Sequence, residues 1–149
     1  MIQEYQVSGF RVREYEELRS TNTEAERVGW DELEDKMVIL TYKQTQGRGQ
    51  VGNHWESEPG KNISMTVVFK PRELPAGQQF AVSMVIALGA CDFISRYVAG
   101  CTVKWPNDIY VGDRKISGIL IEHSIMGRYV GGSLCGIGVN INQEHFLSD

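Results

Sequence analysis

The turns after Gly100 limit what this chain can fold into, because they separate strands with no helix between them. Four segments there have the length and apolar content of strands, namely 102–105, 108–111, 115–122 and 129–141. Pro106 stops the first, and Gly112-Asp113-Arg114 is a hairpin signal between the next two. A doubly wound parallel sheet requires a crossover, usually a helix, between its strands. The pattern therefore predicts an α+β domain, in which helices pack on a mixed, largely antiparallel sheet.

The first hundred residues are predicted to supply the helices and the remaining strands. Strand patterns occur at 10–15, 37–42 and 63–69. Thr21 and Glu24 have the spacing of a capping box, so a helix should begin near them and run toward Gly29. A second helix is expected from about Gln78 to Val98, with apolar residues at steps of three and four and more on its other faces. We therefore expect this second helix to be largely buried.

Composition narrows the class of protein. The 149 residues suit one domain, and 42% of them are hydrophobic, enough for a core. The net charge of −4 argues against a nucleic-acid binder, which usually has a basic face. No signal-peptide pattern is visible, and the apolar stretch from Phe80 to Ala90 is too short to span a membrane. Cys91, Cys101 and Cys135 lack a CxxC spacing, which favours free thiols and a cytoplasmic location.

A long polar loop at 43–62 is the first candidate for a binding site, since loops of this length usually bind something. Its Gly47-x-Gly49-x-x-Gly52 pattern fits dinucleotide-binding and kinase expressions, but no helix pattern follows, and neither an HRD nor a DFG motif is present. Glycines still let backbone amides approach an anion, and Arg48 adds a permanently charged donor for phosphate or carboxylate. Trp55 would pack on a ligand ring. A solvated loop with Trp55 as a core anchor is an equal alternative on spacing alone.

Lys104 is the second candidate. It precedes Trp105-Pro106-Asn107-Asp108, where a strand ends in a turn. A lysine held there by rigid backbone keeps its charge in one position, which suits catalysis. The alternative is a surface lysine that forms an ion pair with Asp108. The three histidines show no HExxH or comparable spacing, so no metal site is predicted.

Five motifs occur in the order of the biotin–protein ligase catalytic domain, which the chain resembles from Tyr15 onward. They are Ser20-Thr21-Asn22, the segment from Gln44 to Trp55, Lys104-Trp105-Pro106-Asn107-Asp108, the segment from Arg114 to Glu122, and the segment from Gly136 to Asn142. The resemblance implies a fold similar to the class II aminoacyl-tRNA synthetase/biotin synthetase-like fold. Lipoate–protein ligases share that fold but are not expected to combine the GRG loop with KWPND. Residues 1–149 are expected to form a catalytic domain that is incomplete at its C-terminal end, with no room for an N-terminal DNA-binding domain.

The resemblance implies a two-step protein biotinylation. Biotin and ATP, with Mg²⁺, give biotinyl-5′-adenylate, and the acyl group then passes to a lysine on the biotin-carrier domain of a carboxylase. It implies neither a nucleic acid nor a membrane as partner, and it allows a homodimer. A biotin-binding fragment without catalysis and a lipoate–protein ligase relative remain as alternatives.

The resemblance also assigns residues to roles. Arg48 and Lys104 would be catalytic, because they neutralise charge as a carboxylate meets a polyphosphate. Many family members have arginine where Gln50 stands, so weaker retention of the adenylate is expected here. The residues assigned to biotin are Ser20, Thr21, Asn22, Gln44, Gly47, Arg48, Gly49, Gln50, Lys104 and Gly118. Those assigned to the nucleotide are Arg48, Gly49, Gln50, Trp55, Lys104, Asn107 and Asn140.

Overall fold

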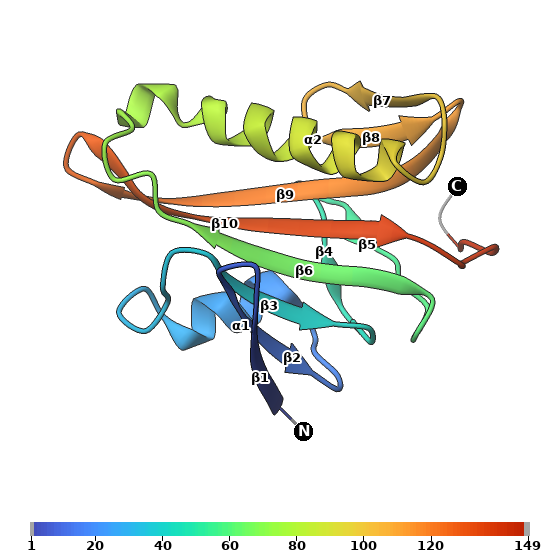
Figure 1. The fold of residues 1–149 in the computed structure, drawn as a ribbon, viewed down its shortest axis with the longest axis horizontal. Helices are drawn as coiled ribbons and strands as arrows, with labels where there is room; N and C mark the ends of the chain where they lie inside the picture. Colours follow the sequence, from blue (N-terminus) through green and yellow to red (C-terminus); the bar gives the residue numbers. More distant parts are fainter. Residues whose placement is uncertain (1, 148–149) are drawn as a thin grey trace.

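A computed structural model describes residues 2–147 and shows one large sheet of eight strands (Figure 1). In order across the sheet, the strands are β1 (Ile2–Val7), β2 (Phe10–Tyr15), β3 (Met37–Thr41), β6 (Asn62–Phe69), β10 (Tyr129–Asn140), β9 (Arg114–Met126), β8 (Asp108–Val111) and β7 (Cys101–Lys104). Only β2 and β3 pair in parallel, because a helix connects them. The prediction of a mixed, largely antiparallel sheet is confirmed. Strand β1, which has a polar sequence, was not predicted.

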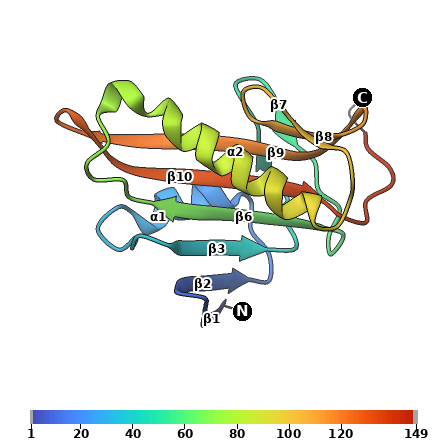
Figure 2. The ribbon, with the colours of Figure 1, turned by 45° about the horizontal axis from the view of Figure 1, so that its top comes forward.

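The helices α1 (Thr21–Val28) and α2 (Phe80–Ser95) cover opposite faces of the sheet (Figure 2). Alternation along the strands explains this arrangement, since successive side chains point to opposite faces. One face packs Met37 and Ile39 against Ala25 of α1. The other packs the α2 face that contains Ala87 and Ile94 against a cluster from the opposite half of the sheet; the strand residues in that cluster are Ile109, Ile119, Ile137 and Val139. A short 3₁₀ turn, η1 (Ala76–Gln78), leads into α2.

The cap of α1 differs from the predicted capping box by one position. Ser20 has the extended backbone of an N-cap, and its hydroxyl accepts a hydrogen bond from the Thr23 amide at 3.5 Å. Glu24 turns away from the cap to Arg27, with hydrogen bonds of 2.7 and 2.9 Å. Gly29 ends the helix with φ of 84°, as predicted from its position.

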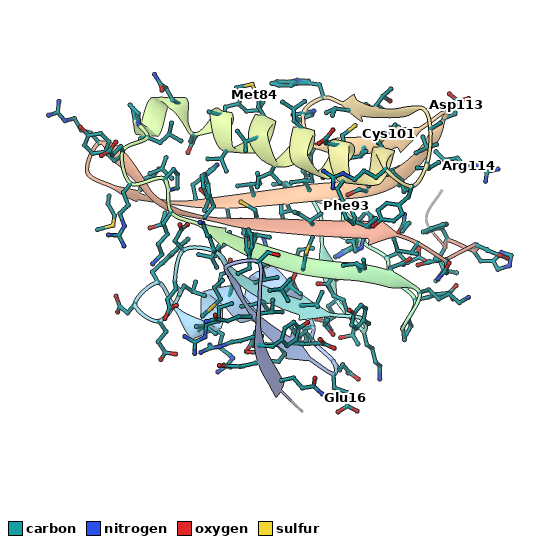
Figure 3. The ribbon with its side chains drawn as sticks, in the orientation of Figure 1. Glu16, Met84, Phe93, Cys101, Asp113 and Arg114 are labelled. Carbon is teal, nitrogen blue, oxygen red and sulfur yellow. The ribbon has the colours of Figure 1, made fainter. Side chains whose placement is uncertain are left out.

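The prediction that the second helix is largely buried is wrong. Within α2, the buried residues are Val82, Ala87 and Ile94, whereas Met84, Val85 and Leu88 are 48%, 61% and 64% exposed. Figure 3 shows Met84 on the side of α2 away from the sheet. Residues 76–95 are also long and apolar enough to cross a membrane by length and composition. That is weak evidence, since one side of this helix packs on the sheet.

Candidate active site

An open cleft of about 1730 Å³ lies along the face of the sheet that carries α1. The start of α1 forms one wall, and the predicted glycine loop forms another. Within that loop, β4 (Gly47–Arg48) and β5 (His54–Trp55) pair as a small separate hairpin. Strands β6, β8, β9 and β10 also contribute to the lining. The long loop is therefore structured against the sheet and is not a free surface loop.

Glycines form part of the cleft floor. Ser64, Gly138 and Gly118 stand abreast on β6, β10 and β9. The ring of Trp55 lies over the two glycines: a Cβ atom added to Gly138 would fall 2.3 Å from Trp55 Cε2, and one added to Gly118 would fall 2.9 Å from Cζ3. In the neighbouring row, a Cβ on Gly136 would fall 2.4 Å from Asn22 Oδ1. Only glycine admits these close approaches.

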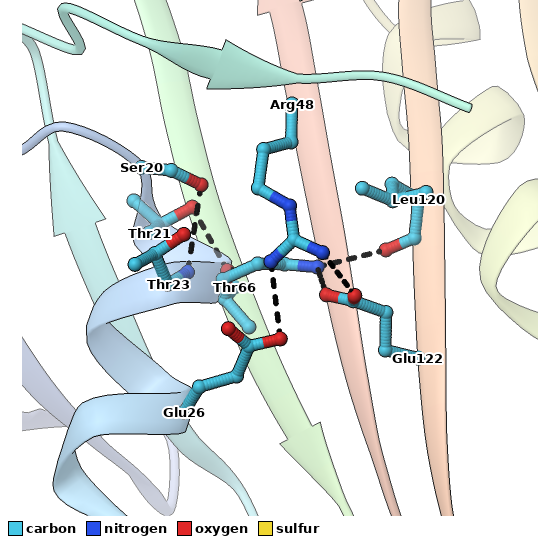
Figure 4. Close-up of polar contacts among 9 residues, drawn as sticks. Ser20, Thr21, Thr23, Glu26, Arg48, Thr66, Leu120 and Glu122 are labelled. Atoms are coloured by element: carbon cyan, nitrogen blue, oxygen red, sulfur yellow. Dashed lines mark hydrogen bonds and ion pairs between the residues drawn. The ribbon is translucent and has the colours of Figure 1, made fainter. Parts of the chain in front are cut away.

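A buried polar network organises the start of α1 (Figure 4). Asn22 Nδ2 donates to Glu122 Oε2 at 2.8 Å, and Asn22 Oδ1 lies 2.5 Å from Thr66 Oγ1. The amide oxygen can only accept, so Thr66 donates to it, and the Thr21 hydroxyl, 2.8 Å away, donates to Thr66. Gln44 Oε1 accepts from the Thr21 backbone amide at 3.0 Å. Hydroxyl and amide groups from three distant segments are thus held in fixed positions.

Arg48 extends from β4 across this network to two carboxylates. Its guanidinium forms ion pairs with Glu122 and with Glu26, the latter at 3.0 Å (Figure 4). The hydrogen bond that Arg48 donates to Glu26 raises the pKa of Arg48, and the charge of Glu122 adds to this effect. The loop arginine is therefore neutralised by acidic residues of the protein, and an anionic ligand would compete with them for it.

Lys104 does not line the cleft, although the other residues assigned to a site from the sequence do. It ends the edge strand β7, and its ammonium lies 4.7 Å from the Tyr110 ring centroid and 3.4 Å from the Tyr110 hydroxyl. Lys115 lines the cleft instead, 2.7 Å from Asp108 Oδ1 and 5.8 Å from the Trp55 ring centroid. Asp108 therefore pairs with Lys115 and not with Lys104, the partner that the alternative interpretation gave it.

Among the residues that the structure describes, three buried polar atoms in the cleft lining have no hydrogen-bond partner. They are Trp55 Nε1, Ser64 Oγ and Asn140 Oδ1. The first can only donate, the last can only accept, and the hydroxyl can do both. Buried polar atoms are normally satisfied, so these three are suited to contact a ligand or ordered water. Within residues 2–147, no cluster of three or more His, Cys, Asp or Glu side chains could hold a metal ion.

Residues 15–140 match the model of the biotin/lipoate A/B protein ligase family. The chain belongs to this family. It is 28% identical to the bifunctional ligase/repressor BirA of Bacillus subtilis, with 93% of this chain and 43% of that protein covered. It is 34% identical to the biotin–[acetyl-CoA-carboxylase] ligase of Paracoccus denitrificans, with 82% and 51% covered. The chain therefore spans about half the length of these ligases.

Solved structures of biotin protein ligases share the fold. The Aquifex aeolicus enzyme in complex with biotin and ATP superposes with a TM-score of 0.74 at 25% identity, covering 92% of this chain and 55% of that one. The Leishmania major enzyme in complex with biotinyl-5-AMP gives 0.71 at 25% identity, covering 93% and 60%.

Sequence reasoning did not single out Ser64 and Lys115, which line the cleft. It also missed Thr66 and Glu122, which hold the lining residues Asn22 and Arg48 in place. Lys115 and Glu122 lie within the Arg114–Glu122 motif that carried the resemblance, so the motif was a signal for them. Ser64 and Thr66 lie in an apolar strand where nothing in the sequence marks them. Their role follows from the strand register, which sets Ser64 beside Gly138 and Thr66 beside Gly136.

Proposed function

We propose that this chain is the catalytic part of a biotin–protein ligase. Biotin's carboxylate would attack the α-phosphate of ATP, giving biotinyl-5′-adenylate and pyrophosphate. A lysine amine on the biotin-carrier domain of a biotin-dependent carboxylase would then attack the acyl carbon and release AMP. The observation that carries the proposal is the cleft itself, where the polar network of Thr21, Asn22 and Gln44 faces a glycine floor beneath the arginine-bearing loop.

The start of α1 suits the ureido end of biotin. That group offers two N–H donors and one carbonyl acceptor, and it matches side chains that both donate and accept, such as the hydroxyls and amides of Ser20, Thr21, Asn22 and Gln44. These four residues are buried and line the cleft. Because neighbouring groups hold them in place, little side-chain freedom would be lost on binding.

The cations around the cleft suit the activation step. Carboxylate and polyphosphate repel, and two unit charges about 4 Å apart interact by roughly 4 kcal/mol at an effective dielectric near 20. Arg48 could offset this repulsion after leaving its carboxylate partners, and Lys115 is positioned beside Trp55 to do the same. Lys104 remains a catalytic proposal, and its side chain would have to turn from Tyr110 toward the cleft. Gly47, Gly49 and Gln50 would cover the acyl–phosphate junction, whereas Trp55, Asn107 and Asn140 would serve the nucleotide.

The remaining features of the proposal concern partners. The described residues offer no acidic cluster for Mg²⁺, so we assign the ion no protein site; it would accompany ATP as a counter-ion of the phosphates. The carrier domain is the proposed macromolecular substrate, in the cytoplasm, and a homodimer is compatible with it. Neither a nucleic acid nor a membrane is part of the proposal.

Two measurements, made one after the other, test the proposed function. Calorimetry with biotin and with lipoate decides which acid binds; we expect biotin, and binding of lipoate alone would identify a lipoate ligase relative. Biotin-dependent exchange of pyrophosphate into ATP then tests catalysis. We expect Lys115→Ala to reduce exchange about 100-fold or more, as for loss of an electrostatic contact to the transition state. Lys104→Ala reports separately on Lys104, and Lys61→Ala, outside the cleft lining, is the control.

The outcomes separate the alternatives. Biotin binding without exchange would identify a fragment that binds biotin without catalysis. Failure to bind either acid would refute the proposal. Exchange that survives both Lys115→Ala and Lys104→Ala would contradict the roles given to these lysines while leaving the function itself intact.

A further inference from the structure

Two thiols lie against each other outside the cleft, where α2 meets β7. Cys91 Sγ is 3.2 Å from Cys101 Sγ, and both residues are partly exposed. Cys91 belongs to the last part of α2, and Cys101 is the first residue of β7; Figure 3 labels Cys101 beside the helix. The sulfurs are therefore already in contact, and a bond between them requires their separation to fall to about 2.05 Å.

We propose that Cys91 and Cys101 form a dithiol modification site, which hydroperoxides or small disulfides oxidise to an intramolecular disulfide. With hydrogen peroxide, one thiolate attacks a peroxide oxygen and becomes a sulfenic acid as one water leaves. The second thiol attacks that sulfur, and a second water leaves. Two thiols and one peroxide thus give one disulfide and two waters, with two electrons passing from sulfur to oxygen. With oxidised glutathione, one thiolate displaces a glutathione thiolate to form a mixed disulfide, and the second thiol displaces the other glutathione, so two glutathione thiols leave.

The third cysteine shows why the site is restricted to this pair. Cys135 on β10 has no exposed surface, and burial raises the pKa of its thiol to about 12, so it presents little thiolate to an oxidant. Burial also raises the pKa of Cys91, and the adjacent Cys101 thiol contributes to this shift. The selectivity of the pair therefore comes from the proximity and exposure of the two sulfurs, not from an unusually acidic thiol.

The bond would join the helix on the sheet face opposite the cleft to the edge of the sheet. It would link the end of α2 to β7, an edge strand whose single strand partner is β8. Strand β7 ends at Lys104, and Asn107 in the following turn lines the cleft. Closing the short loop between the cysteines also restricts the unfolded chain, so we expect the oxidised protein to melt about 5 °C higher.

The experiment treats the purified chain with hydrogen peroxide, and separately with oxidised glutathione, without any ligand. Trypsin cleaves after Arg96, which lies between the two cysteines, so a crosslink would hold peptides 73–96 and 97–104 together. We expect intact protein to lose the mass of two hydrogens, and the joined peptides to separate on adding dithiothreitol. Cys135, in peptide 129–149, should stay available for alkylation after denaturation.

Single substitutions provide matched controls. Cys91→Ser and Cys101→Ser should each abolish the crosslink and the rise in melting temperature, whereas Cys135→Ser should keep both. Links to Cys135, covalent dimers, or stable adducts without loss of two hydrogens would overturn the site. A crosslink that leaves the melting temperature unchanged would overturn the claim that the disulfide stabilises the fold. Neither readout uses biotin or ATP, so this test stands apart from that of the ligase activity.

Discussion

The guanidinium of Arg48 is paired with the carboxylate of Glu122, and the other oxygen of that carboxylate accepts from Asn22 Nδ2 at 2.8 Å. One acidic residue on β9 therefore joins the glycine loop to the start of α1. Both partners were assigned to ligand binding from the sequence. The acidic residue that joins them was not, because its contacts depend on how β9 passes beneath the loop (Figure 4).

Replacing Glu122 should loosen this junction. Glu122→Gln keeps the shape but removes the charge that pairs with Arg48, and we expect a loss of about 1 kcal/mol in the free energy of unfolding, since the pair is partly exposed. Glu26→Gln removes the more exposed partner and should cost less, about 0.5 kcal/mol or below. Urea unfolding measures both. An equal effect of the two substitutions would contradict a central role for Glu122.

Adding a methyl group to the cleft floor should displace Trp55. In Gly138→Ala the new Cβ would meet the indole at 2.3 Å, and relieving this overlap should cost about 1–3 kcal/mol of stability. Tryptophan fluorescence should shift as the ring moves into water. Gly89→Ala is the matched control: its added methyl meets nothing within 4 Å, and the higher helix propensity of alanine should stabilise α2 by up to about 1 kcal/mol. A fluorescence spectrum unchanged by Gly138→Ala would show that Trp55 does not lie there.

Ser64 should matter more for binding than for stability. Its hydroxyl has no hydrogen-bond partner in the structure, so Ser64→Ala should leave the free energy of unfolding unchanged or raise it slightly. Loss of one hydrogen bond to the ligand should weaken binding of biotin or ATP about 2- to 10-fold, measured by calorimetry. Ser117→Ala is the contrast, because Ser117 Oγ donates to the Gly138 carbonyl at 2.7 Å and its loss should destabilise the fold. Unaltered affinity for both ligands would remove Ser64 from the site.

The sequence predicts this fold well where local signals decide it. Turn residues marked the strands after Gly100, and Gly29 marked the end of α1. It predicts less where distant segments must be aligned. Whether Lys104 or Lys115 faces the cleft depends on the pairing of β7, β8 and β9, which includes an irregularity between Ile109 and Tyr110. Hydrophobic periodicity likewise identified α2 but does not state what covers each of its faces.

Stability at acidic pH should depend on Glu24. The hydrogen bond from Arg27 lowers the pKa of this carboxyl below its ordinary 4.5, and contact with Tyr15 adds to the effect. A carboxyl whose folded-state pKa is lowered stabilises the protein above its unfolded pKa, and that contribution disappears as the pH falls through the folded value. We therefore expect Glu24→Gln to lower the unfolding midpoint at pH 7, and the gap from the wild type to close as the pH drops below about 4.5. Arg27→Met removes the main cause of the lowered pKa. In a protein that carries this substitution, Glu24→Gln should therefore lower the unfolding midpoint at pH 7 by a smaller amount. A gap that stays constant from pH 7 to pH 3 would show that the Glu24 charge does not stabilise the fold.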